Sequence, residues 1–141
     1  MNNQNNLQRF LDAQKSSYQT ALTEIKNGKK RSHWMWYIFP QIQGLGFSET
    51  SKFYAIKDVS EAEAYLQHPV LGARLIEISK VATELSSSNA TQVFGSPDDM
   101  KLKSSMTLFA ALDDPNPVFQ AVLNKFFGGK TDGQTLKMIG K

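Results

Sequence analysis

The residues of this chain best suited to chemistry are polar side chains that stand inside apolar blocks of sequence. A buried polar group without a hydrogen-bond partner costs roughly 1 to 3 kcal/mol. Each such side chain therefore needs a partner within the fold, a water molecule or a ligand. The residues concerned are His33, Gln41, Tyr54, Arg74, Lys101, Ser104, Ser105, Thr107 and Asp132.

Their types favour recognition of an anion over metal or covalent catalysis. Neither His33 nor His68 has metal-ligand spacing to an acidic residue, so we predict no metal site and no cofactor. Ser104 and Ser105 lack the strained strand-to-helix turn of a hydrolase nucleophile. Aromatic rings beside lysine, arginine and hydroxyl groups instead suit a nucleotide or a sugar phosphate. With catalytic residues left unassigned, the predicted ligand site consists of His33, Trp36, Gln41, Tyr54, Arg74, Lys101 and Ser105.

Residues 32–48, SHWMWYIFPQIQGLGFS, hold both tryptophans and end in two closely spaced glycines. Ser32 is expected to cap a short aromatic helix, and Ser48 the helix that follows. Gly44 and Gly46 permit a positive φ or the close approach of a ligand, although Gly-Leu-Gly alone is no nucleotide fingerprint. The simplest interpretation of the stretch is an aromatic plug in the core. The alternative is one wall of a binding cleft.

Trp34 and Trp36 should point about 200° apart on a helix, because each residue advances the direction by ~100°. We therefore predict that one ring is almost fully buried. The other is predicted to line a pocket whose opposite wall includes Lys101 or Ser105, with His33 at its rim.

The segments that carry these residues are predicted to be helical. Apolar residues recur at helical spacing in residues 7–26, 69–85, 97–112 and 117–127, and no segment alternates as a strand does. Capping boxes that start at Ser60 and Thr131 indicate two shorter helices. We expect an all-α, single-domain orthogonal bundle of about six to eight helices of unequal length, with a surface crevice. It should span residues 7–141, after a disordered tail at residues 1–6.

Composition says more about the location and partners of the protein than about its activity. The 141 residues are 40% hydrophobic and 21% charged, and they include no cysteine. No segment has the ~20 apolar residues of a membrane span, so we expect a cytoplasmic protein without membrane contact. The net charge of +3 is too small an excess to predict nucleic acid as a partner. The oligomeric state is left open.

Four blocks carry a resemblance to a known family: HWMWYIFPQIQGLGFSETSKFYAI, AYLQHPVLGARL, VFGSPDDMKLKSSMTLFA and FQAVLNKFFGGKTDGQTL. Together they resemble the family catalogued as domain of unknown function 1810, from Leu7 to Leu136. The resemblance implies a mainly helical fold with a surface crevice and no established activity. Members have sometimes been labelled calpastatin. That label does not suit this compact, patterned chain, because such calpain inhibitors are long, repetitive and disordered.

The closing blocks also resemble, distantly, the end of the helical family that acts on ADP-ribose and N-glycosidic bonds. The Glu-His-aromatic motif of that family has no counterpart here, so this resemblance implies a class of ligand and not an activity.

Two functions follow as hypotheses. The first is a helical domain that binds a small anionic ligand, nucleotide or ADP-ribose-like, in a crevice next to HWMWYIFPQ, with turnover undecided. The alternative is a non-enzymatic protein-interaction module that uses the exposed part of this stretch as its patch. Convergence of His33, Gln41 and Lys101 in one pocket would argue against the alternative.

Overall fold

The fold is all-α, as predicted. The computed structural model describes residues 6–141, so residues 1–5 of the predicted tail lie outside the described residues. Within them no strand occurs, and one more helix forms than the six to eight expected, because residues 90–94 form a helix and not a single turn. The nine helices of the described range are α1 (Gln8–Lys26), α2 (Met35–Ile38), α3 (Glu49–Tyr54), α4 (Val59–Gln67), α5 (Leu71–Thr83), α6 (Ala90–Phe94), α7 (Asp98–Ala110), α8 (Pro117–Phe127) and α9 (Gly133–Met138).

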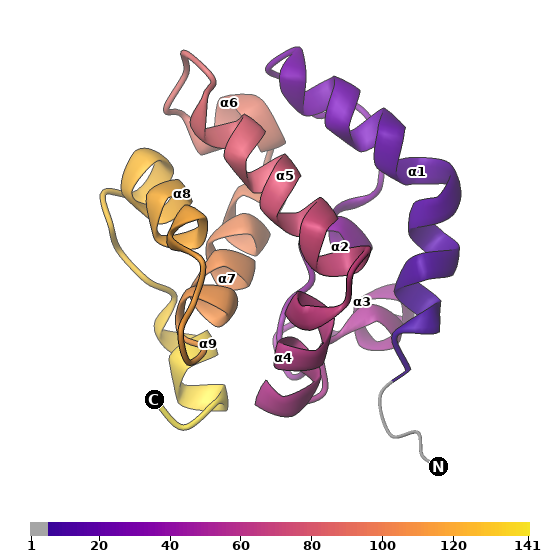
Figure 1. Cartoon of the computed structure of the whole chain (residues 1–141). Coiled ribbons are helices and arrows are strands. Elements are labelled where there is room, and N and C mark those ends of the chain that lie inside the picture. The colour runs from indigo at the N-terminus through magenta and orange to yellow at the C-terminus, as the bar shows by residue number, and fades with distance from the viewer. Residues whose placement is uncertain (1–5) are drawn as a thin grey trace.

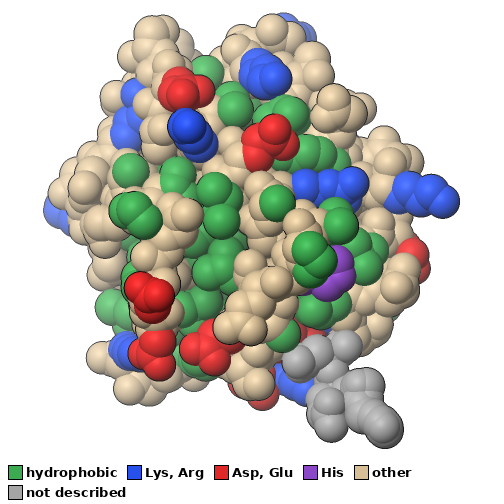
Figure 2. All heavy atoms as spheres, in the orientation of Figure 1, with side chains coloured by type: hydrophobic (Ala, Val, Ile, Leu, Met, Phe, Trp, Pro, Cys, Tyr) green, Lys and Arg blue, Asp and Glu red, His purple; other side chains and the backbone are tan. Residues whose placement is uncertain are grey.

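Helix α5 crosses the middle of the molecule and packs against α1 on one side and α8 on the other (Figure 1). Helix α7 packs against α6, α8 and α9. The space between the ribbons of α5 and α8 is filled by side chains, and hydrophobic groups gather near the centre of this face (Figure 2). In the described part of the chain, none of the helices combines the length and the apolar composition that crossing a bilayer requires.

A row of buried aromatic rings joins four of the helices. Phe10 of α1, Tyr65 of α4, Phe109 of α7 and Phe119 of α8 have successive centroid separations of 5.0, 5.7 and 5.6 Å. An aromatic side chain buries roughly 150 to 250 Å², and tilted or edge-to-face pairs add about 0.5 to 1.5 kcal/mol each. This row therefore accounts for much of the cohesion between the two ends of the chain.

A second aromatic row contains the middle of the central stretch. Trp34 and Phe39 lie 6.3 Å apart, and the row continues through Phe94 to Phe126 at 5.9 and 6.0 Å. Trp34 is 1% exposed and Phe39 is fully buried. This part of the stretch is therefore a core plug, in agreement with the simpler of the two interpretations.

The carboxylate of Glu24, on the last turns of α1, organises the entry to the central stretch. It accepts hydrogen bonds from the backbone N–H of Arg31 (2.8 Å) and of Ser32 (3.0 Å), from the Ser32 hydroxyl (2.5 Å) and from Trp34 Nε1 (2.9 Å). The prediction that Ser32 caps the short helix is wrong, because its hydroxyl donates to this carboxylate. Helix α2 starts at Met35 without a side-chain cap.

Aspartates replace two of the expected caps. Asp58 caps α4 in place of Ser60, and Asp132 caps α9 in place of Thr131. A carboxylate accepts strongly from backbone N–H groups and is favoured at the positive end of the helix dipole. Ser48 caps α3 as predicted.

A buried ion pair ties the start of α1 to the first turn of α4. Arg9 Nη2 lies 3.0 Å from Glu61 Oε1, and both side chains are almost fully buried. Arg9 also donates to the carbonyls of Phe53 (2.8 Å) and Ala55 (2.7 Å), and Glu61 accepts from Lys57 N (2.9 Å). Because both charges are hydrogen-bonded on several sides, the pair fixes the path of the chain after α3.

The first prediction concerns Glu24, which is 9% exposed. Burial alone would raise the pKa of its carboxyl, but the hydrogen bonds from Ser32, Arg31 and Trp34 lower that pKa from 4.5 to about 2. A pKa that is lower in the folded chain stabilises the fold above the unfolded value, and this stability is lost as pH falls through the folded value. The free energy of unfolding should therefore drop by on the order of 3 kcal/mol between pH 5 and pH 2 through this group.

Urea unfolding followed by circular dichroism at several pH values tests this. Glu24→Gln should lower stability at pH 7 and flatten the loss between pH 5 and pH 2. Glu84→Gln, an equal charge change at an exposed position at the end of α5, serves as the control. Equal slopes for Glu24→Gln and the parent would contradict this role.

Candidate functional site

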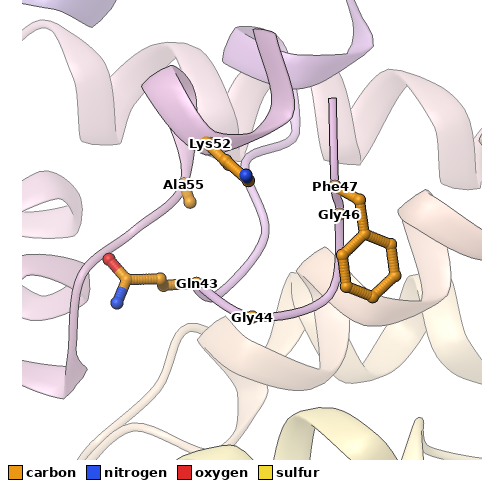
Figure 3. A pocket seen from close by; sticks show the side chains of 6 residues that line it. All are labelled: Gln43, Gly44, Gly46, Phe47, Lys52 and Ala55. Atoms are coloured by element: carbon orange, nitrogen blue, oxygen red, sulfur yellow. The ribbon is translucent and has the colours of Figure 1, made fainter. Parts of the chain in front are cut away.

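Two hollows lie against residues 43–47, here called the glycine loop. The α3 hollow, about 400 Å³, is lined by Gln43, Gly44, Gly46, Phe47, Lys52 and Ala55 (Figure 3). The α7 hollow, about 380 Å³, is lined by Gln41, Gly44, Leu45, Gly46, Phe47, Ser51, Pro97, Met100, Lys101, Ser104, Asp132 and Gln134. Three further hollows, at the ends of α1 and α5, beside residues 112–116 and beside residues 87–91, contain none of the predicted site residues.

The glycine loop is anchored at its base by a short parallel bridge. Gln43 N donates to Ile56 O (2.7 Å), and Ile56 N donates to Gln41 O (2.8 Å). Ile56 belongs to the segment that the Arg9–Glu61 pair fixes. The buried ion pair therefore sets where the loop leaves the core and where Gln41 enters the α7 hollow.

Close approach explains the two glycines of the loop. A Cβ at Gly46 would lie 2.5 Å from Ser51 Cβ, closer than carbon atoms can pack. Gly44 has φ +103°, and a Cβ there would lie 3.0 Å from Met138 Cε. The loop is thus held between the start of α3 and the end of α9, which narrows the space beside it.

The loop leaves backbone donors free. The N–H groups of Gly46 and Phe47 donate no hydrogen bond to any residue that the structure describes. The Phe47 side chain is 83% exposed. Its ring lies on the outer side of the loop, whereas Lys52 and Ala55 lie inside the curve (Figure 3). Two backbone N–H donors and an exposed aromatic ring therefore belong to residues that line the α7 hollow.

Two ion pairs that share Asp98 lead to the α7 hollow, which Lys101 lines. Lys30 Nζ lies 2.9 Å from Asp98 Oδ2, and Lys101 Nζ lies 3.5 Å from Asp98 Oδ1. Two cations share one carboxylate, so one positive charge is left uncompensated within this group. The Lys101 side chain is 22% exposed, and its ammonium sits 5.0 Å from the centroid of the Trp36 ring. Partial burial strengthens the attraction of this ammonium for an anion.

Asp132, which also lines the hollow, attaches α9 to α7. Its Oδ2 accepts from Ser104 Oγ (3.0 Å), Thr135 N (3.1 Å) and Thr135 Oγ1 (2.5 Å), and its N–H donates to Thr107 Oγ1 (2.9 Å). Two of the polar residues singled out in the sequence, Ser104 and Thr107, are therefore hydrogen-bonded to a third, Asp132. Asp132 Oδ1 accepts no hydrogen bond from the described part of the chain.

The structure brings together some of the predicted site residues. Gln41 and Lys101 line the same hollow. Trp36 is half-buried and carries the Lys101 ammonium on its ring, but it does not itself line the hollow. His33 is exposed, does not line the hollow, and uses its carbonyl to accept from the Tyr37 hydroxyl (3.5 Å).

The remaining predicted residues lie elsewhere. Tyr54 belongs to an aromatic cluster with Tyr37, 5.2 Å away, and burial raises the pKa of its hydroxyl. Arg74 stacks over the Tyr18 ring at 5.0 Å. Ser105 is fully buried in α7, and its hydroxyl has no hydrogen-bond partner among the described residues.

Two apolar residues of the α7 hollow were not predicted. Phe47 and Met100 are 83% and 53% exposed, although large hydrophobic side chains are normally buried. Phe47 stands between a glycine and a serine and outside any helical apolar stripe. This position was the only signal in the sequence that its ring is exposed. No group of three or more His, Cys, Asp or Glu residues that could hold a metal ion occurs in residues 6–141.

These features define a small all-α protein with a hollow beside a glycine loop, bordered by one partly buried lysine. The sequence matches the model of the family described as protein of unknown function (DUF1810) over residues 4–139, and the chain belongs to this family. The resemblance seen in the sequence is thereby confirmed.

A solved structure agrees with the fold. The crystal structure of the conserved hypothetical protein Rv1873 from Mycobacterium tuberculosis is 44% identical to this chain and superposes with a TM-score of 0.93. The match covers 96% of each of the two chains. No curated protein matches the sequence.

The second prediction separates the two tryptophans. Trp34 is 1% exposed, as predicted for one of the pair, and Trp34→Ala should lower the free energy of unfolding by ~3 to 5 kcal/mol. Trp36→Ala removes a half-buried ring, and its cost should be at most about half as large. Urea unfolding of both variants measures the difference, and equal, severe losses would show that both rings serve only the core.

Proposed function

We propose that the chain binds a small phosphate-bearing ligand in the α7 hollow, with nucleotides and ADP-ribose-like compounds as the class to test and turnover undecided. The observation that carries this proposal is the convergence of Gln41 and Lys101 in one hollow beside the glycine loop. Both are polar residues that stand inside apolar blocks of the sequence.

The available donors suit a phosphate. Lys101 provides a partly buried ammonium, Gln41 an amide, and Gly46 and Phe47 provide backbone N–H groups that are free within the described structure. Hydrogen bonds to an ionised group are about twice as strong as neutral ones. The volume of about 380 Å³ lies within the range of roughly 300 to 1,000 Å³ found for small-molecule sites.

A specific observation also favours the alternative function, a protein-interaction module. Phe47, Met100 and Met138 are 83%, 53% and 48% exposed; Phe47 and Met100 line the α7 hollow, and Met138 lies beside the lining residue Gly44. Exposed apolar groups gathered in one place commonly mark a binding surface for another protein. Convergence of His33, Gln41 and Lys101 in one pocket would argue against a protein-interaction module. Gln41 and Lys101 line the same hollow, but His33 does not line it.

The third prediction tests the anionic ligand. Thermal unfolding should shift upward with at least one member of a panel of ATP, AMP, ADP-ribose and ribose 5-phosphate. A ligand at 100 times its dissociation constant adds about 2.7 kcal/mol of stability. Lys101→Met keeps the apolar stem over Trp36 but removes the charge, so it should weaken binding at least about tenfold.

Lys80→Met is the matched control, because Lys80 is exposed on α5 and does not line either hollow of the glycine loop. Its affinity for the ligand should equal that of the parent. The proposal fails if no member of the panel shifts the transition, or if both lysine variants weaken binding equally.

A further inference from the structure

The most exposed large hydrophobic residue of the described chain is Phe47, and nothing within the fold uses its ring. We infer that Phe47 stacks on an aromatic ring of the ligand, so that the α7 hollow selects phosphate esters that carry a base over plain sugar phosphates. This inference rests on the proposed function and assigns to it a residue that determines specificity.

The position of Phe47 suits a stacking residue. The ring lies on the outer side of the glycine loop, and Phe47 lines the α7 hollow together with Met100 (Figure 3). Exposing an apolar ring to water is unfavourable by roughly 25 cal/mol per Å², which covering by a ligand would recover. The ring is attached to a loop whose base is hydrogen-bonded to Ile56, so its location is defined although its surface is open.

Met100 offers a second apolar surface to the hollow. It is 53% exposed and reaches the hollow from the first turn of α7, whereas Phe47 reaches it from the loop. A thioether is polarizable, adapts its shape and packs favourably against aromatic rings. The Phe47 ring and the Met100 thioether thus give the hollow two groups that pack favourably against an aromatic base.

The polar groups of the hollow differ in chemistry, and together they suit a ligand with two different ends. Lys101 and the free N–H groups of Gly46 and Phe47 suit a phosphate. Asp132 instead offers Oδ1, an acceptor unused within the described structure, which suits a hydroxyl or an amino group. A phosphate is repelled by the carboxylate, so the phosphate is placed toward Lys101 and the donor groups toward Asp132. Inorganic phosphate would satisfy only one of these ends.

Trp36 does not offer the hollow an open ring face for stacking. The Lys101 ammonium already lies over its ring at 5.0 Å, and Trp36 does not line the α7 hollow. Trp36 acts instead as a support that orients Lys101. The open aromatic face of the hollow is therefore that of Phe47.

Isothermal titration of the full chain with AMP and with ribose 5-phosphate tests this inference, since the two probes share the phosphate and ribose and differ in the base. Base-aromatic stacking is worth about 1 to 3 kcal/mol, so the parent should bind AMP at least about fivefold tighter. Phe47→Ala should bring the affinity for AMP to that for ribose 5-phosphate, which should itself change less than about twofold. Phe47→Tyr should restore the preference.

Phe53→Ala is the matched control, because Phe53 is 56% exposed, lies on α3 and does not line the α7 hollow. It should keep the preference for AMP, and circular dichroism should show the same fold in all three variants. Equal affinities for the two probes in the parent, or an unchanged preference in Phe47→Ala, would overturn the inference and leave the proposed function standing. Absence of binding by both probes and by the wider panel would overturn the proposed function and this inference together.

Discussion

The arrangement of the molecule depends on one desolvated carboxylate, that of Glu24. Its four hydrogen bonds gather the backbone of residues 31 and 32 and the indole of Trp34 at the end of α1. Trp34 then enters the second aromatic row, and Lys30, whose ammonium lies 5.0 Å from the Trp34 ring, turns toward Asp98. Through Asp98 the same arrangement reaches Lys101. The contact between Glu24 of α1 and residues 31–34 is thereby linked, through Lys30 and Asp98, to Lys101 at the α7 hollow.

Much of the fold could be predicted from the sequence, because amphipathic helices repeat apolar residues at intervals of three and four. The helical spacing of apolar residues in residues 7–26, 97–112 and 117–127 predicted three helices, and α1, α7 and α8 are present there. Caps were less predictable. Ser60 and Asp58 both have side chains that accept hydrogen bonds from N–H groups, and the choice between them depends on the position of Glu61, which the distant Arg9 fixes.

The candidate site was predictable in its chemistry and not in its geometry. Gln41 and Lys101 were identified as polar residues in apolar surroundings, but their meeting depends on the bridge between residues 41–43 and 56 and on the packing of α7. Arg74 has the same residue-level signal, yet its partners are Tyr18 and Gln14. Ser104 and Thr107 likewise form hydrogen bonds with Asp132. No local pattern distinguishes a polar side chain that will be satisfied by the fold from one left for a ligand.

The two tryptophans give the protein a pair of intrinsic optical reporters. Indole emission responds to exposure to water and to nearby charge, and these two rings differ in both respects. Trp34 is enclosed and bonded to the Glu24 carboxylate, whereas Trp36 is half-buried beneath the Lys101 ammonium. With either ring replaced by phenylalanine, the fluorescence of the other reports separately on the integrity of the core or on the surroundings of the Lys101 side chain. The chain thus carries, without labelling, one signal for its interior and one for the border of the α7 hollow.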